Sequence, residues 1–93
     1  MRFEWDEDKR QDNLRKHGLD FQDAAEVFDG PRLVRHDARH DYGEDRWVTI
    51  GIAKNRVVVV VYTEDDTNEV IRIISLRKAL SYERKRFQEY LTN

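Results

Sequence analysis

The sequence contains no cysteine. Disulfide bonds and thiolate metal sites, which stabilise many small secreted domains, are therefore excluded. The chain also has no apolar run near the roughly 20 residues needed to span a bilayer, and its charged N-terminus is unlike a signal peptide. We therefore expect a soluble, cytoplasmic protein that makes no contact with a membrane, with residues 1–93 forming one small domain.

A net positive charge is missing too. The chain has 17 Lys and Arg residues against 19 Asp and Glu residues, a formal charge of −2 at pH 7. Long-range attraction for a polyanion such as RNA is therefore weak. Acidic residues outnumber basic ones before residue 46, however, and the reverse holds after it. Any binding of a polyanion must be local to the basic C-terminal half.

Proline and glycine are scarce, with one and four residues, so few positions interrupt regular structure. Asp6 is a typical N-cap for a helix that begins with acids, ends with bases at His17 and stops at Gly18. This helix is nearly all polar, with Leu14 as its main apolar residue, so it should hold to the surface along one edge. A second helix is predicted from an Asp20 cap to residue 28.

Segments rich in β-branched residues predict strands after these helices. The middle segment contains five consecutive valines, so its strand should be covered on both faces. A last helix is predicted from a Ser81 cap. The fold class is therefore α+β, with two N-terminal helices, a central antiparallel sheet and a C-terminal helix. The sheet is expected to be a meander of residues 47–52, 56–63 and 70–75, with short extra strands at residues 3–5 and 32–35 and a polar loop at residues 36–45.

Cations follow the last predicted strand closely. Arg72 lies within it, and Arg77 and Lys78 are placed in the connection to the last helix. Charge beside a packed core costs several kcal/mol unless an anion compensates for it. Either an acidic residue of the chain or an external anion must compensate the charge of these cations. Guanidinium forks match phosphate oxygens, so the cluster suits a phosphate, and Arg46 would join it if the strand register allows.

Histidine and aromatic residues offer further candidates. His17 ends the first helix beside Lys16, and histidine changes its charge near neutral pH. A cation there also stabilises the helix dipole without any other role. Trp5, Trp47 and Tyr62 have rings that can stack on bases, although aromatic residues in strands usually pack in a core.

A His-Asp pair occurs twice at a spacing of four residues, in His36-Asp37 and His40-Asp41. On a helix this spacing would gather four metal ligands on one side. The segment does not have a helical pattern, so a solvated loop is the default interpretation. A metal-dependent phosphodiesterase built on these residues is kept as an alternative.

Short motifs are spread over nearly the whole chain. In the first half they are Phe3-Glu4-Trp5-Asp6, Lys9, Asn13, Lys16-His17-Gly18, Phe21, Ala24 and Phe28-Asp29. In the second half they are Glu44, Arg46, Gly51, Val60, Tyr62-Thr63, Ile71-Arg72-Ile73-Ile74-Ser75, Arg77-Lys78-Ala79 and Glu83. In combination they resemble the BrnT family of bacterial toxins. Departures lie mainly in residues 35–45, which weakens any role for His36 or His40.

The resemblance implies a ribonuclease toxin of a type II toxin–antitoxin pair, with a fold similar to the RelE toxins. Such an enzyme cleaves RNA, inhibits translation and arrests growth. The resemblance also implies a BrnA-type antitoxin, a ribbon-helix-helix protein that forms a heterotetramer with the toxin and alone contacts operator DNA. A non-catalytic corepressor that only binds the antitoxin is the alternative.

RNA cleavage without a metal or other cofactor needs cations at the phosphorane and groups that move protons. On this hypothesis the phosphorane would be stabilised by Arg72 and Arg77, together with Arg46 if the register allows. Neither Arg72 nor Arg77 would be permanently occupied by a carboxylate of the chain. His17 or Lys16 would transfer protons, unless the site is purely electrostatic. RNA would be bound by Lys16, Lys78, Tyr62 and Trp5.

Overall fold

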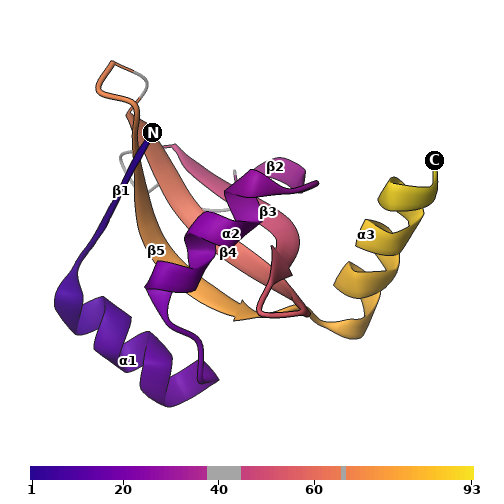
Figure 1. Ribbon diagram of the computed structural model, residues 1–93, viewed down its shortest axis with the longest axis horizontal. Helices are drawn as coiled ribbons and strands as arrows, with labels where there is room; N and C mark the ends of the chain where they lie inside the picture. Colours follow the sequence, from indigo (N-terminus) through magenta and orange to yellow (C-terminus); the bar gives the residue numbers. More distant parts are fainter. Residues whose placement is uncertain (38–44, 66) are drawn as a thin grey trace.

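A five-stranded sheet forms the centre of the molecule in a computed structural model, which describes residues 1–37, 45–65 and 67–93 (Figure 1). The order across the sheet is β1-β5-β4-β3-β2. The strands are β1 (Arg2–Trp5), β2 (Leu33–Asp37), β3 (Arg46–Ala53), β4 (Arg56–Asp65) and β5 (Val70–Lys78). The predicted α+β class and the antiparallel meander of β3, β4 and β5 are confirmed.

The sheet as a whole is mixed, because β1 pairs in parallel with β5. The expectation of a wholly antiparallel sheet is corrected in this respect. A strand of four residues carries too little pattern to specify its neighbour or its direction. β2 also extends further than expected and takes in His36 and Asp37, because both residues pair with the start of β3.

The helices are α1 (Glu7–His17), the 3₁₀ turn η1 (Phe21–Asp23), α2 (Ala24–Asp29) and α3 (Ser81–Thr92). The side chain of Asp6 accepts hydrogen bonds from the backbone N–H groups of Asp8 and Lys9, at 2.9 and 3.2 Å, which starts α1 as predicted. Gly18 ends it with a φ of 68°. The predicted second helix is divided into η1 and α2, so the helices differ in detail from the RelE-like arrangement expected.

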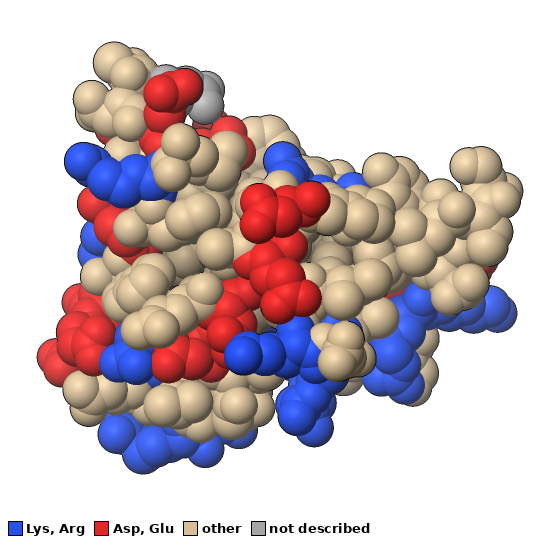
Figure 2. Space-filling view, viewed as in Figure 1, with Lys and Arg blue, Asp and Glu red and all other residues tan. Residues whose placement is uncertain are grey.

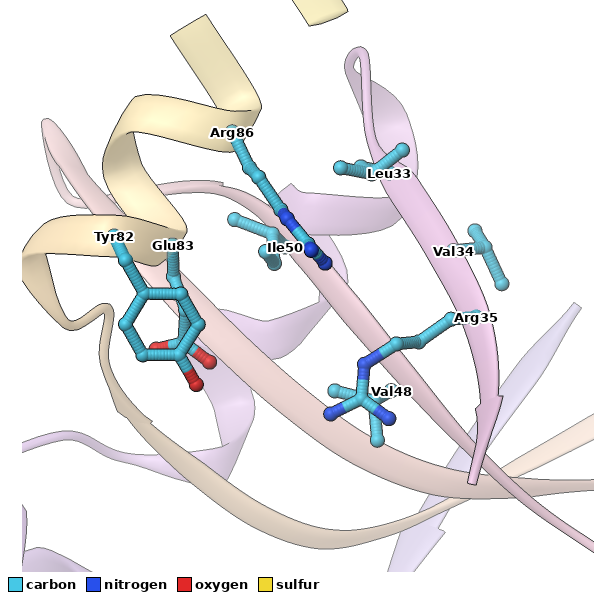
Figure 3. A pocket seen from close by; sticks show the side chains of 8 residues that line it. All are labelled: Leu33, Val34, Arg35, Val48, Ile50, Tyr82, Glu83 and Arg86. Carbon is cyan, nitrogen blue, oxygen red and sulfur yellow. The ribbon is translucent and has the colours of Figure 1, made fainter. Parts of the chain in front are cut away.

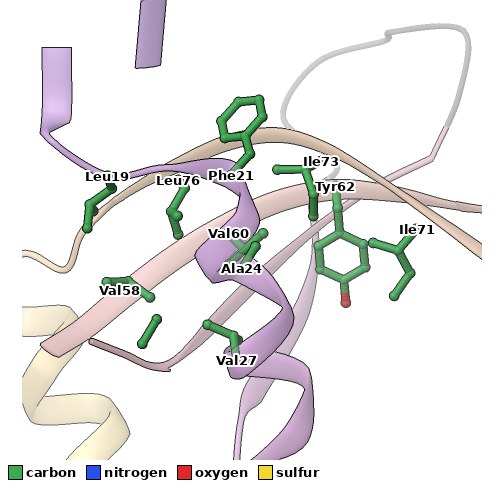
Figure 4. Close-up of a cluster of buried hydrophobic side chains, with 11 residues drawn as sticks. Leu19, Phe21, Ala24, Val27, Val58, Val60, Tyr62, Ile71, Ile73 and Leu76 are labelled. Atoms are coloured by element: carbon green, nitrogen blue, oxygen red, sulfur yellow. The ribbon is translucent and has the colours of Figure 1, made fainter. Parts of the chain in front are cut away.

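One apolar cluster joins α2 and η1 to the sheet (Figure 4). Burial of each large side chain in it contributes roughly 1.5–3 kcal/mol to folding. α2 crosses β3 so closely at Gly51 that a Cβ atom there would lie 2.6 Å from the Cγ1 of Val27. The cluster contains Leu19, Phe21, Ala24, Val27, Ala53, Val58, Val60, Tyr62, Ile71, Ile73 and Leu76.

A second, smaller cluster lies on the other face of the sheet, because successive side chains of a strand point to opposite faces. Phe87 of α3 packs there on Val48, Ile50, Val59 and Ala79. The five-valine strand is thus covered on both faces, as predicted. Within the described part of the chain, no helix is long and apolar enough to cross a membrane.

Candidate functional site

Four of the predicted site residues line one groove of about 370 Å³, although they come from opposite ends of the chain. This basic groove is formed by Lys16 and His17 at the end of α1, by Arg77 and Lys78 at the end of β5, and by Leu80. No carboxylate is among these lining residues. Figure 2 shows Lys and Arg side chains along the lower edge of the molecule, from α1 to the start of α3, whereas acidic side chains gather in the middle and on the left of the same face. The basic pole expected from the sequence therefore includes the end of α1.

Asn13 holds the two halves of the basic groove together. Its side-chain Nδ2 donates a hydrogen bond of 2.7 Å to the carbonyl of Leu76, and its Oδ1 accepts one of 3.1 Å from the N–H of Leu76. Nδ2 also donates to the carbonyl of Leu19 at 3.1 Å. Because Asn13 lies one turn before His17, and Leu76 lies directly before Arg77, these bonds set Lys16 and His17 beside Arg77 and Lys78.

Arg77 is held by a carboxylate of the chain itself. Its two terminal nitrogens donate hydrogen bonds of 2.8 and 2.9 Å to the two carboxylate oxygens of Glu83, in the first turn of α3. Glu83 also accepts a bond of 2.8 Å from the N–H of Leu80, which fixes the start of the helix. Leu80, rather than the predicted Ser81, is therefore the cap residue. Arg77 and Lys78 lie within β5, not in a connection after it, because they pair with Val59 and Val58.

The Arg77–Glu83 pair is only partly shielded from water. The side chain of Glu83 is 5% exposed, but that of Arg77 is 32% exposed and lines the basic groove. The hydrogen bonds from Arg77 are the main reason that the pKa of Glu83 lies below its ordinary value, with smaller contributions from the N–H of Leu80 and the charge of Arg35. Glu83 thus stays ionised and holds the guanidinium at the groove.

Arg72 lies elsewhere. It is five residues before Arg77 on β5, which corresponds to about 15 Å along a strand. Its guanidinium is 3.3 Å from a carboxylate oxygen of Glu4, and both side chains are nearly half exposed. Such surface pairs open easily and contribute roughly 0–1 kcal/mol. The hollow around Arg72 contains four carboxylates against two guanidinium groups, and is lined by Arg2, Glu4, Asp45, Thr63, Glu64, Asp65, Asn68, Val70 and Arg72.

The expectation that both arginines are free of the chain's own carboxylates therefore fails. Arg72 pairs with Glu4 and Arg77 with Glu83. Neither is sealed inside the fold, because each lines a surface hollow. The two hollows differ in their charge: the hollow around Arg72 has an excess of carboxylates and repels a polyanion, whereas the basic groove attracts one.

Arg46 lies at the same end of the sheet as Arg72. It directly precedes Trp47, which pairs with Tyr62 of β4, and Arg72 directly precedes Ile73, which pairs with Tyr62 from the other side. The two arginines are thus separated by one strand, or about 10 Å. Arg46 is opposite Asp37 of β2 in the register. It is not among the residues of the basic groove.

The three aromatic candidates pack in or against the first apolar cluster, Tyr62 within it and Trp5 and Trp47 against it. Tyr62 is 2% exposed, and its hydroxyl accepts a hydrogen bond of 3.0 Å from Thr49, so its ring has no face open to a base. Burial is the main reason that the pKa of Tyr62 lies above its ordinary value. Trp5 is partly buried and makes an edge contact with Phe21, at 6.3 Å between ring centroids.

The repeated His-Asp pair is only partly described. His36 lies on β2 and its Nε2 is 3.1 Å from a carboxylate oxygen of Asp45, whereas the adjacent Asp37 is buried. His40 and Asp41 lie outside the described residues. Among residues 1–37, 45–65 and 67–93, no three His, Cys, Asp or Glu side chains are grouped as a metal would require.

Two residues of the site were not singled out by chemical reasoning from the sequence. Asn13 and Glu83 entered only through the family resemblance. One signal was present in each case: asparagine is unfavourable inside a helix unless its amide has a specific partner, and Glu83 is the first acid after a dense run of cations. Leu14, which was expected to anchor α1, is 40% exposed instead, and Asn13 is the buried residue of that helix.

Comparison with known proteins identifies one match. The model of the family described as "Ribonuclease toxin, BrnT, of type II toxin-antitoxin system" matches residues 5–83. A comparison with curated proteins finds no similar sequence. The matched range includes α1, the whole of β5 and the first turn of α3, and so every residue of the basic groove together with Asn13 and Glu83.

Proposed function

The chain belongs to the BrnT family of ribonuclease toxins of type II toxin–antitoxin systems, and we propose that it cleaves RNA in the basic groove without a metal ion. The observation that carries this proposal is the meeting of Lys16 and His17 with Arg77 and Lys78 around one groove. Three permanent cations and a histidine supply both phosphate binding and proton transfer.

The reaction proposed is attack by a ribose 2′-oxygen on the adjacent phosphorus. A bond forms between the 2′-oxygen and phosphorus, and the bond from phosphorus to the 5′-oxygen breaks, which leaves a 2′,3′-cyclic phosphate and a 5′-hydroxyl. One proton must leave the 2′-hydroxyl and one must reach the 5′-oxygen. We assign these transfers to His17 and Lys16, which are both exposed at the groove.

Arg77 is proposed to stabilise the negative charge of the phosphorane. A cation that is already in place needs little reorganisation during the reaction. One such group lowers the activation free energy by about 3 kcal/mol, which is roughly a hundredfold in rate. Glu83 gives Arg77 its orientation, but it also neutralises part of its charge. Lys16 and Lys78, which make no ion pair among the described residues, then supply most of the attraction for phosphate.

Arg72 and Arg46 are proposed to contact RNA outside the scissile phosphate. Arg72 lies about 15 Å from Arg77 along β5, and Arg46 lies outside the basic groove, at the same end of the sheet as Arg72. An RNA chain that follows the sheet from the groove reaches Arg72 once the weak pair with Glu4 opens.

For the biology, we propose that cleavage inhibits translation and arrests growth in the cytoplasm, and that a BrnA-type antitoxin neutralises the enzyme in a heterotetramer. A RelE-like fold is part of the same proposal. It is supported by the α+β class and the antiparallel meander.

The test is cleavage of single-stranded RNA by the purified chain, free of antitoxin, in excess EDTA. Replacing the Arg77–Glu83 pair by two glutamines keeps hydrogen bonding between the side chains and removes the charges. We expect the R77Q/E83Q variant to cleave about a hundredfold more slowly. The matched control is R72Q/E4Q, the same exchange at the other pair, which should retain activity within about threefold. Equal losses in the two variants, or activity that EDTA abolishes, would contradict the proposal.

One observation favours a second function. Because Glu83 already occupies Arg77 through two hydrogen bonds, a corepressor that binds the antitoxin and cleaves RNA feebly is the alternative. The two functions differ in one measurement: expression of the chain without its antitoxin arrests growth only if it is an active nuclease.

A further inference from the structure

A second groove, of about 450 Å³, lies between α3 and the strands β2 and β3. Figure 3 shows the side chains that surround it: α3 contributes one wall, β2 the other, and β3 lies between them. We call it the α3 groove. It is lined by Leu33, Val34, Arg35, Val48, Ile50, Tyr82, Glu83 and Arg86.

The floor of the α3 groove is apolar and its edges are cationic. Val48 and Ile50 of β3 are buried residues of the second cluster, and Leu33 packs against them. Arg35 and Arg86 reach toward the groove from β2 and α3 (Figure 3). Within the described part of the chain, neither arginine makes a hydrogen bond or an ion pair, although the charge of Arg35 acts on nearby Glu83. The groove is therefore complementary to a ligand with both apolar and acidic groups.

The strand beside the groove is an edge. β2 is the last strand of the sheet, and its pairing is with β3 alone among the described strands. Its outer backbone groups are therefore available to pair with an added strand. Val34 is 43% exposed and points away from the groove, which leaves the face of β2 that carries Leu33 and Arg35 turned toward it (Figure 3).

We propose that an extended segment of the antitoxin adds to β2 and occupies the α3 groove. This inference rests on the proposed function for the existence of an antitoxin partner. In an added strand, successive side chains point to opposite faces, so every second side chain of the segment faces the groove. Those side chains are apolar where they lie over Leu33 and Ile50, and acidic where they meet Arg35 and Arg86.

The groove favours a protein segment over RNA for two reasons. RNA offers neither aliphatic side chains for the apolar floor nor backbone amides for the edge of β2. The ionised carboxylate of Glu83 also lies in the wall and repels phosphate. Glu83 lines the α3 groove and also holds Arg77 of the basic groove. A segment in the α3 groove therefore ends next to the site of cleavage.

The test uses titration calorimetry to measure the affinity of the purified chain for the BrnA-type antitoxin of the proposed function. We expect R86E and R35E each to weaken binding by about tenfold or more. The control is K85E, the same charge change on the outer side of α3, which should alter the affinity less than twofold. Neutral variants R86Q and R35Q, with smaller effects in the same direction, replace either reversed variant that fails to fold by circular dichroism.

Hydrogen exchange of the complex is the second measurement. Amides of residues 33–37 should become at least tenfold slower to exchange, since an added strand pairs with the edge of β2. Unchanged affinity in the arginine variants, or unchanged exchange in β2, overturns the inference. So does a concentration-dependent dimer of this chain alone, if the same variants disrupt it.

RNA cleavage by the groove variants without antitoxin is followed in parallel. If the unmodified chain fails to cleave RNA but the variants lose antitoxin binding, the proposed function fails and the docking inference stands.

Discussion

The side-chain amide of Asn13 pairs with the backbone of Leu76 through one donated and one accepted hydrogen bond, as a neighbouring strand would. This pairing joins a helix near the N-terminus to the last strand, 63 residues away. α1 has little apolar surface of its own to bury, since Leu14 faces solvent. The amide therefore replaces the apolar stripe that normally fixes a helix on a sheet.

From this relationship we predict that Asn13→Ala destabilises the chain. The variant leaves the carbonyl and N–H of Leu76 without their partner in a buried place, which costs about 2–3 kcal/mol. Thermal unfolding followed by circular dichroism should show a midpoint lower by roughly 10 °C. Asp12→Ala changes an exposed neighbour and is the control, with a shift of no more than about 2 °C. Equal midpoints for the two variants would show that the amide does not anchor α1.

The pair of Arg77 and Glu83 makes folding sensitive to acid. The pKa of Glu83 in the folded chain lies below its ordinary value of 4.5, mainly through the hydrogen bonds from Arg77. The unfolded chain therefore binds the proton first, so stability from this group is fully present above about pH 5. It is lost as the pH falls through the lower, folded pKa.

We accordingly predict that Glu83→Gln flattens the acid limb of the stability curve. Urea unfolding at pH 7 should show the variant about 2 kcal/mol less stable than the unmodified chain, since one partner of a partly buried pair is removed. The difference should shrink steadily as the pH falls below 4.5. A difference that is constant between pH 7 and pH 3 would mean that the carboxylate is not perturbed in the folded state. Glu89→Gln, on the same helix, serves as the exposed control.

His17 provides a prediction about chemistry rather than folding. We expect His17→Ala to lower kcat for RNA cleavage by about a hundredfold with little change in KM, since a proton-transfer group acts mainly in the transition state. Lys16→Ala should lower kcat and also raise KM, because Lys16 is proposed both to transfer a proton and to bind phosphate. His36→Ala alters an exposed histidine far from the groove and should leave both constants unchanged. Full activity in the His17 variant would indicate a purely electrostatic site.

Local patterns in the sequence predicted those features that local interactions determine. Asp6 and Gly18 set the two ends of α1 through bonds to residues a few positions away. The alternation and the run of valines identified β3, β4 and the first part of β5 in the same way. These features follow from period and capping chemistry, which can be read from neighbouring residues.

Features that depend on distant partners were not predictable. Arg77 and Lys78 extend β5 because Val59 and Val58 pair with them, and no property of the two residues themselves indicates a strand. The parallel pairing of β1 with β5 likewise joins residues from opposite ends of the chain. The carboxylates that pair with Arg72 and Arg77 also come from other elements: Glu4 from β1 and Glu83 from α3. The sequence therefore identified a set of candidate cations, but not which of them share a groove.

The last prediction concerns Gly51, where helix and sheet come closest. Its backbone lies against α2, so an added Cβ atom would meet the Cγ1 of Val27 at 2.6 Å. Val27 is completely buried in the first cluster, so any movement of its side chain disturbs the packing of its neighbours. We therefore expect Gly51→Ala to cost about 1–3 kcal/mol of unfolding free energy, as overpacking of a core does. Gly30→Ala, where a Cβ atom has nothing within 4 Å, is the matched control and should be nearly neutral.

Adding Val27→Ala to the Gly51 variant should cost less than Val27→Ala does in the unmodified chain, because the new methyl group fills part of the space that the valine leaves. Equal costs in the two backgrounds would show that the two side chains do not meet.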